Sequence, residues 1–102
     1  MSTDNKLEHH AKLLSAMANE KRLQILKLIS ERELGVGELA SLVGLSQSAL
    51  SQHLAKLRAN QLVATRRDAQ SIYYSTSHSG VRSILQTLGA MSLDTDDRKL
   101  AI

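Results

Sequence analysis

The sequence predicts a single, mainly helical domain that carries one small β-hairpin. Apolar residues recur every three or four positions over several separate stretches, which is the period of amphipathic helices. Two short runs, 62–66 and 71–75, are rich in β-branched and aromatic residues and lie close enough in sequence to pair as a hairpin. A length of 102 residues with 42% hydrophobic content suits one domain, which we assign to residues 1–102.

The first part of the chain predicts two helices followed by a break. Residues 6–18 carry apolar side chains at helical spacing, and Asn19 is a suitable N-cap for the next helix. That helix continues to about Arg32 with a denser apolar face, as expected of a central core helix. Residues 33–37 interrupt the pattern because they include two glycines.

Two further helices joined by a tight turn come next. A short helix over 37–43 ends before Gly44, which stands where a left-handed C-cap belongs, and Ser46 can cap a helix that runs to about Arg58. So short a connection, with a glycine in it, is typical of a helix-turn-helix. The hairpin that follows makes the arrangement a winged helix-turn-helix, with element order α-α-α-α-β-β-α.

The second helix of this pair has one apolar and one polar arc. Leu50, Leu54 and Leu57 share a narrow arc at 100° per residue and are expected to pack inward. Small hydroxyls and amides fill the adjoining arc, and such side chains allow close approach to base edges in a DNA major groove. An ordinary solvated face would carry Lys and Glu instead. The predicted base-reading residues are Gln47, Ser48, Ser51 and Gln52.

Positive charge gathers on the same half of the chain. Residues 46–82 hold five Lys and Arg against one Asp, a net charge of +4, so that the other residues sum to −1 within the total of +3. Such clustering is typical of proteins that bind a polyanion. The residues predicted to contact the DNA backbone, or the minor groove beside the hairpin, are Lys56, Arg58, Arg66, Arg67 and Gln70.

The hairpin is the predicted wing. Its connection, residues 67–70, lacks the Asn-Gly or Asp-Gly pair of a tight turn, so we expect a loose tip. Neighbouring residues of a strand point to opposite faces, which places one of Tyr73 and Tyr74 in the core and the other outside.

The first and last helices predict a homodimer. A last helix over 79–91 carries an apolar stripe beyond what a small head requires, as does the first helix, and two-fold dimers are the commonest soluble assemblies. Residues 1–5 and 94–102 are expected to be flexible ends. The predicted interface residues are Leu7, Ala11, Leu14, Val81, Ile84, Leu85 and Leu88.

These motifs resemble the ArsR/SmtB family of winged-helix repressors, over about residues 7–93. Residues 16–26, Ala-Met-Ala-Asn-Glu-Lys-Arg-Leu-Gln-Ile-Leu, look like the entry to that family's second helix, and residues 38–54 look like its helix-turn-helix. The resemblance implies a sequence-specific transcriptional regulator, a homodimeric repressor that binds a palindromic operator in double-stranded DNA.

The chain departs from the metal-sensing members of that family. Those members carry Cys, His, Asp and Glu ligands at positions occupied here by Gly35, Gly37, His78, Gly80, Met91 and Asp94. Glycine has no side chain to offer, and one imidazole with one carboxylate falls short of a tetrahedral ligand set. The departures imply a regulator without the usual metal sites, and we expect no cofactor and know of no small-molecule effector.

The remaining histidines are expected to serve structural or solvent-exposed roles. His9 and His10 are adjacent, so they diverge by 100° on a helix and do not form a ligand pair. His53 flanks the leucine arc, where packing with a hydrogen bond is expected, and His78 is expected at the start of the last helix.

Composition and motifs exclude several classes of protein. The sequence has no nucleophile elbow and no phosphate-binding glycine loop, so we expect no enzyme. It lacks an apolar run of about 20 residues and a signal-peptide pattern, so we expect a cytoplasmic protein without a membrane partner. The absence of cysteine excludes disulfides and thiolate sites. Two alternatives stay open: an effector- or metal-responsive sensor with a non-standard site, and a winged-helix protein-interaction module.

Overall fold

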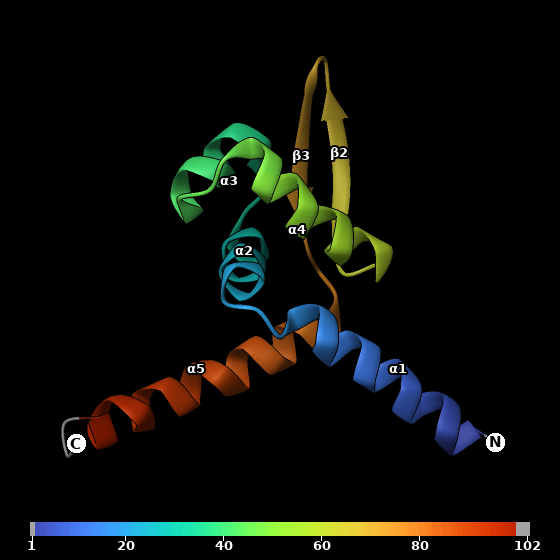
Figure 1. The fold of residues 1–102 in the computed structure, drawn as a ribbon, viewed down its shortest axis with the longest axis vertical. Coiled ribbons are helices and arrows are strands. Elements are labelled where there is room, and N and C mark those ends of the chain that lie inside the picture. Colours follow the sequence, from blue (N-terminus) through green and yellow to red (C-terminus); the bar gives the residue numbers. More distant parts are fainter. Residues whose placement is uncertain (1, 100–102) are drawn as a thin grey trace.

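The computed structural model describes residues 2–99, and its side chains are described for residues 6–91. It has the predicted architecture of helices around a small antiparallel sheet (Figure 1). In chain order the elements are α1 (Ser2–Met17), α2 (Glu20–Glu31), β1 (Leu34–Gly35), α3 (Val36–Val43), α4 (Gln47–Ala59), β2 (Ala64–Asp68), β3 (Ser71–Ser75) and α5 (Ser79–Lys99).

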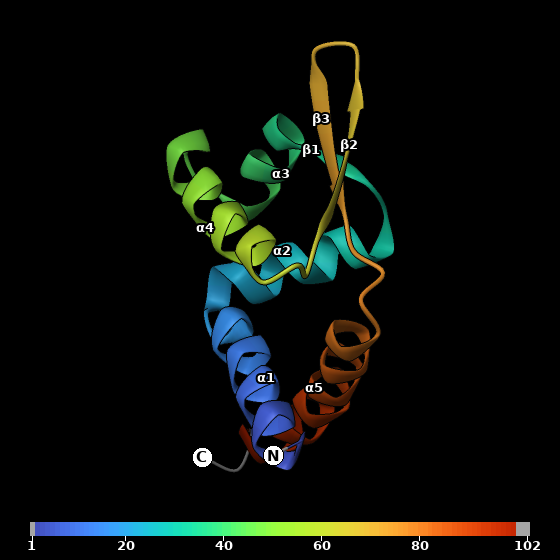
Figure 2. The same ribbon diagram turned by 90° about the vertical axis from the view of Figure 1, so that its right-hand side faces the viewer.

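The molecule divides into a head and two projecting helices. We call residues 20–75, from α2 to β3, the head. α1 and α5 leave it at the end opposite the hairpin tip (Figures 1 and 2), and Figure 1 shows them diverging from each other. The radius of gyration is 15.2 Å, whereas a compact domain of this length has about 13 Å. The larger radius comes from α1 and α5, which project from the head.

Three predicted helix ends are confirmed. The side chain of Asn19 accepts a hydrogen bond from the backbone N–H of Arg22 at 3.0 Å, and Ser46 Oγ accepts one from Ala49 N–H at 3.1 Å. Gly44 takes the left-handed conformation, with φ of 71°. These three local signals fix where α2 and α4 begin and where α3 ends.

The core lies where α2, α3 and α4 meet the base of the hairpin. Each of these helices contributes its apolar stripe, and α1 closes one end through Ala16 and Met17. The largest fully buried side chains are Ile25, Leu26, Ile29, Leu34, Leu39, Val43, Leu50, Leu54, Leu57 and Val81.

The sheet differs from the prediction in three details. Its strand order is β1-β3-β2, and the two-residue β1 was not predicted. β2 begins at Ala64 and continues through Asp68, which pairs with Ser71, so the expected loose tip over 67–70 is wrong. The turn is instead only two residues long, and Ala69 adopts φ of 59° to make it, a conformation that L-residues adopt at a cost.

The tyrosines follow the predicted alternation, because Tyr74 is buried while Tyr73 stays half-exposed. α5 extends beyond the predicted end at Met91. The expectation of flexible ends over 1–5 and 94–102 lies outside the residues whose side chains are described, and it stays a prediction.

Candidate nucleic-acid interface

The helix-turn-helix holds α4 against the core by its leucine face. Gly44 N–H donates to Ser41 C=O at 3.3 Å and Leu45 N–H donates to Ala40 C=O at 3.0 Å, which closes the end of α3 and turns the chain. Three leucines on one side of α4 are then buried, so the opposite side must face solvent. The buried leucines are Leu50, Leu54 and Leu57.

The exposed side of α4 carries the four predicted base-reading residues together. All four are exposed, and none forms a side-chain hydrogen bond with any residue that the structure describes. Their amides and hydroxyls therefore retain their full capacity to bond an external partner, and a Gln amide matches the paired donor and acceptor of adenine. We call Gln47, Ser48, Ser51 and Gln52 the polar face of α4.

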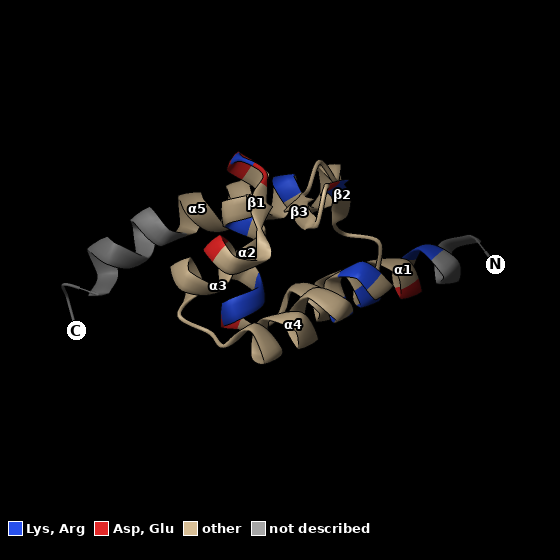
Figure 3. Cartoon of the chain, turned by 90° about the horizontal axis from the view of Figure 1, so that it is seen from above, with Lys and Arg blue, Asp and Glu red and all other residues tan. Residues whose placement is uncertain are grey.

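Basic side chains lie at the end of this helix. Lys56 and Arg58 belong to the last turn of α4, and both are exposed. Figure 3 colours the basic and acidic positions along the ribbon. Arg58 Nη1 donates to the Tyr74 hydroxyl at 3.2 Å, which links α4 to β3. This single bond leaves the other guanidinium N–H groups of Arg58 available.

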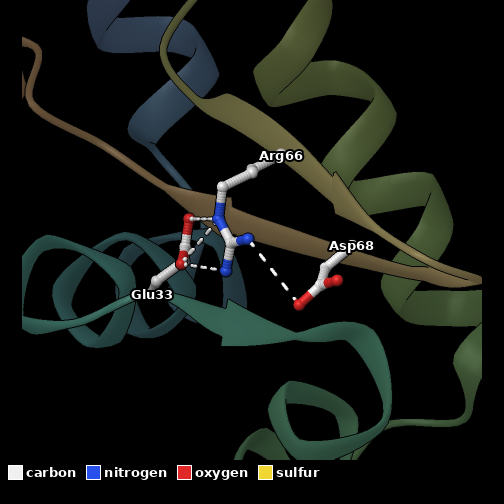
Figure 4. Close-up of polar contacts among 3 residues, drawn as sticks. All are labelled: Glu33, Arg66 and Asp68. Carbon is white, nitrogen blue, oxygen red and sulfur yellow. Dashed lines mark hydrogen bonds and ion pairs between the residues drawn. The ribbon is translucent and has the colours of Figure 1, made fainter.

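Arg66 on the wing is already engaged within the chain. Its Nη2 donates to Glu33 Oε1 at 2.8 Å, and its Nε lies 3.1 Å and 3.0 Å from Glu33 Oε1 and Oε2 (Figure 4). Asp68 Oδ2 lies 4.0 Å from Nη1, and the guanidinium sits 4.9 Å from the centre of the Tyr73 ring. The hydrogen bond from Arg66 lowers the pKa of Glu33, and the same bond raises the pKa of Arg66.

This arrangement changes the role expected for Arg66. Glu33 and Asp68 offset its charge, so it is a weaker candidate for a phosphate contact than the sequence suggests. Glu33 was missed, since it falls in the segment that breaks the helical pattern. No local signal connects positions 33 and 66, because they meet only through the pairing of β1 with β3 and β3 with β2.

The wing tip carries the other two predicted contacts. Arg67 and Gln70 are exposed, and neither side chain has a hydrogen bond or ion pair within the described part of the chain. Arg67 is therefore the freer of the two wing arginines.

The predicted dimer surface is only partly available. Leu7 is 61% exposed and Leu14 is 53% exposed on α1, and Ala11 is exposed between them. On α5, Ile84, Leu85 and Leu88 are half-buried. Val81 is fully buried in the core of its own chain, so its assignment to the dimer interface is wrong. An apolar stripe at helical spacing does not reveal which members face a partner.

The histidines take the structural roles expected of them. His78 Nδ1 accepts a hydrogen bond from Val81 N–H at 3.2 Å and thereby helps to cap α5. His53 Nδ1 lies 3.4 Å from Arg22 Nη1 and faces α2, away from the polar face. Among the residues that the structure describes, no group of three or more His, Asp and Glu side chains could hold a metal ion. Asp94 lies outside the described side chains.

Comparisons with known proteins agree on one family. Residues 19–65 match the model of the bacterial regulatory proteins of the arsR family. The nodulation protein NolR of Rhizobium meliloti is 60% identical over 87 residues, which cover 85% of this chain and 71% of that protein.

Solved structures give the same result. The crystal structure of NolR from Sinorhizobium fredii matches with a TM-score of 0.84 and 57% identity, covering 88% of this chain and 90% of that one. The homodimeric winged helix-turn-helix DNA-binding domain of Mb0332 from Mycobacterium bovis matches with a TM-score of 0.82 and 26% identity, covering 94% and 89%. No described helix of the present chain is long and apolar enough to span a membrane.

Proposed function

The chain belongs to the arsR family of bacterial regulatory proteins, and on that basis we propose that it is a homodimeric repressor that reads a palindromic operator with the polar face of α4. Like its relatives, it is a DNA-binding transcriptional regulator and not an enzyme. Its proposed location is the cytoplasm, where bacterial DNA is found.

One observation carries the proposed reading mechanism. Gln47, Ser48, Ser51 and Gln52 are exposed together and have no side-chain hydrogen bonds to the described part of the chain. In water such groups gain little from this arrangement, but at a base edge each can replace a hydrogen bond to water with a directed hydrogen bond to the base. A protein-interaction module would instead expose apolar side chains on this face of α4.

Backbone contacts follow from the free cations. Lys56 and Arg67 have no ion pair among the described residues, and Arg58 is held by one hydrogen bond only. Lys56 and Arg58 follow the polar face along α4, and Arg67 lies on the wing, so these cations support a register in which phosphates flank the bases that α4 reads. Each phosphate neutralised adds about 0.9 to the slope of log affinity against log salt concentration.

Dimerisation would place two copies of α4 on one duplex. An exposed apolar stripe lies on α1 and consists of Leu7, Ala11 and Leu14. α5 diverges from α1 (Figure 1) and leaves this stripe uncovered. Burial of this stripe against a second copy would set two recognition helices about 34–36 Å apart, one turn of DNA. Repression is the direct consequence if the operator overlaps a promoter.

The test is selection of duplexes from a random-sequence pool with the purified protein, followed by titration of the selected duplex at several salt concentrations. We expect a two-fold symmetric site and a salt-dependent affinity. Gln52→Glu should abolish the preference for the selected sequence, whereas Gln86→Glu, which adds the same charge at an exposed position of α5, should keep it. Selection of no sequence above background would overturn the proposal.

A further inference from the structure

The first turn of α2 is a junction where three helices meet. It starts at Glu20, next to the end of α1 at Met17 and close to the end of α3 at Val43. The turn carries Lys21 and Arg22, although positive charge is unfavourable at a helix N-terminus. This placement calls for a compensating set of contacts.

Carbonyl groups at the ends of the other two helices provide these contacts. Lys21 Nζ donates to Val43 C=O at 2.7 Å, and Arg22 Nε donates to Ala16 C=O at 2.6 Å. Arg22 Nη2 also lies 3.4 Å from Ser15 C=O. The last carbonyls of a helix have no partner within it and form its negative end, so cations are favourable there.

Arg22 also reaches the recognition helix. Its Nη1 lies 3.4 Å from His53 Nδ1 on α4, so one half-buried side chain from α2 contacts both α1 and α4. A guanidinium can only donate hydrogen bonds. The ring nitrogen must therefore accept, which requires a neutral imidazole with its proton on Nε2.

The surroundings of His53 favour that neutral form. Burial of the ring, followed by the charges of Arg22 and Lys21, lowers the pKa of His53 below its usual value of 6.5. Both charges come from α2, while α1 and α3 bring backbone carbonyls to the junction. Since the unfolded chain takes up this proton more readily, the stability gained from the neutral ring is full above about pH 6.5 and is lost as the pH falls through the lowered pKa.

We propose that Arg22 is a positioning residue that fixes α4 on α1 through the neutral form of His53, so that protonation of His53 weakens DNA binding. This inference rests on the proposed function. His53 directly follows Gln52 of the polar face, so a displaced ring moves a base-reading residue. Because α1 is the proposed dimer helix, the same contact sets the distance between the two reading helices.

The direction in which DNA affinity changes with pH separates this mechanism from the direct effect of the charge added on protonation. Protonation adds positive charge, which by itself strengthens binding to DNA. A loss of affinity on acidification that disappears in His53→Gln therefore reports displacement of the helix. With one linked proton, the loss is at most about tenfold per pH unit below the pKa.

The experiment uses a duplex selected by the wild-type protein from a random pool, titrated at fixed salt between about pH 5 and pH 8 around the reference value for His. The wild-type protein should lose affinity as the pH falls. His53→Gln offers Arg22 an amide oxygen that does not titrate. The affinity of this variant for the duplex should therefore stay constant or rise as the pH falls. His10→Gln, the same change at an exposed site on α1, should keep the wild-type profile.

A second variant tests the positioning role. Arg22→Lys keeps the charge but cannot reach both Ala16 and His53, so preference for the selected half-site spacing over one with an inserted base pair should fall by about fivefold or more, a typical coupling between sites. Arg32→Lys, at an exposed arginine, is the control. Circular dichroism and sedimentation would verify that each variant is a folded dimer.

Two results would overturn the inference: an unchanged pH profile in His53→Gln, or an unchanged spacing preference in folded Arg22→Lys. If the wild-type protein binds no selected duplex, the proposed function fails instead. In that case, an NMR titration of the His53 ring without DNA still tests whether Arg22 contacts His53. We expect a pKa below 6.5 that rises in Arg22→Lys, and an ordinary value in both proteins would overturn it.

Discussion

The recognition helix and the wing both present polar and basic side chains to solvent, yet they hold them differently. On α4, the polar face has no intramolecular side-chain hydrogen bonds among the described residues, and its backbone is anchored by buried leucines. On the wing, β2 is exposed along its whole length, and Arg66 is bonded to Glu33, the residue before β1. The helix is a rigid element with free side chains, whereas the wing is an exposed element that needs a side chain to hold it.

This difference shows that a count of Lys and Arg residues does not give the number of basic side chains that are free to contact DNA. Three of the five cations in residues 46–82 are used inside the molecule: Arg66 bonds Glu33, Arg82 donates to the carbonyls of Ser30 and Thr76 at 3.1 Å and 3.3 Å, and Arg58 donates to the Tyr74 hydroxyl at 3.2 Å. The first restrains the wing and the second fixes the start of α5. Lys56 and Arg67 are the cations left without such partners in the described part of the chain.

The largest expected effect separates the two regions by stability. Leu54→Ala truncates a side chain on the buried face of α4 and should lower the free energy of unfolding by about 2–5 kcal/mol. Thr65→Ala, on exposed β2, should change it by no more than about 0.5 kcal/mol. Urea denaturation measures both. Equal effects would mean that the wing is as integral to the core as α4 is.

The next effect concerns base preference. Gln47→Ala should cost about 1–3 kcal/mol of discrimination at one position of each half-site if its amide bonds a base through both atoms. Gln86→Ala, at an exposed position of α5, should leave the preference at every position of the half-site unchanged. Affinities for single-base variants of the selected duplex measure this. A uniform loss across all bases would assign Gln47 to the backbone.

The two wing arginines should differ in salt dependence. Arg67→Ala should weaken all sequences alike and reduce the salt slope by about 0.9 for each phosphate that Arg67 neutralises in the wild-type complex. Arg66→Ala should leave the slope unchanged, because Glu33 already neutralises its charge. The double substitution Glu33→Arg with Arg66→Glu should recover the affinity that either single variant loses. Failure of that rescue, with a reduced slope in Arg66→Ala, would show that Arg66 binds phosphate.

The smallest effect is a pair of Ala→Gly substitutions that should change the free energy of unfolding in opposite directions. Ala69→Gly should raise the free energy of unfolding by less than about 1 kcal/mol, because Ala69 has φ of 59° and glycine adopts this conformation freely. Ala55→Gly, an exposed site on α4, should lower it by about 1 kcal/mol. Thermal denaturation in the same buffer compares them, and a shared sign would refute the backbone account of the turn.

Local features of the fold could be predicted from sequence, whereas features that depend on distant pairing could not. Gly44 and Ser46 mark helix ends through their own chemistry, and three leucines fix the buried side of α4. β1 has only two residues and forms because Leu34 and Gly35 pair with Tyr74 and Tyr73. Without that strand, nothing in the sequence places Glu33 beside Arg66.

The same limit applies to the site residues and the dimer surface. The periodicity that identifies Ile84 and Leu85 also includes Val81, although Val81 faces the core of its own chain. Nothing in the sequence marks Arg22 as a junction residue, since its contacts with Ala16 and His53 join α2 to α1 and α4. Spacing identifies a face but not the element that covers it.

The central claim is that α4 reads bases through its polar face, and NMR of the isotopically labelled dimer with its selected duplex tests it most directly. We predict that the side-chain amide signals of Gln47 and Gln52, with the backbone signals of 46–52, shift most. Arg67 and Gln70 should shift next, and the outer faces of α1 and α5 should be unaffected. Largest shifts on α1 or α5, with unchanged Gln47 and Gln52 amides, would contradict the account.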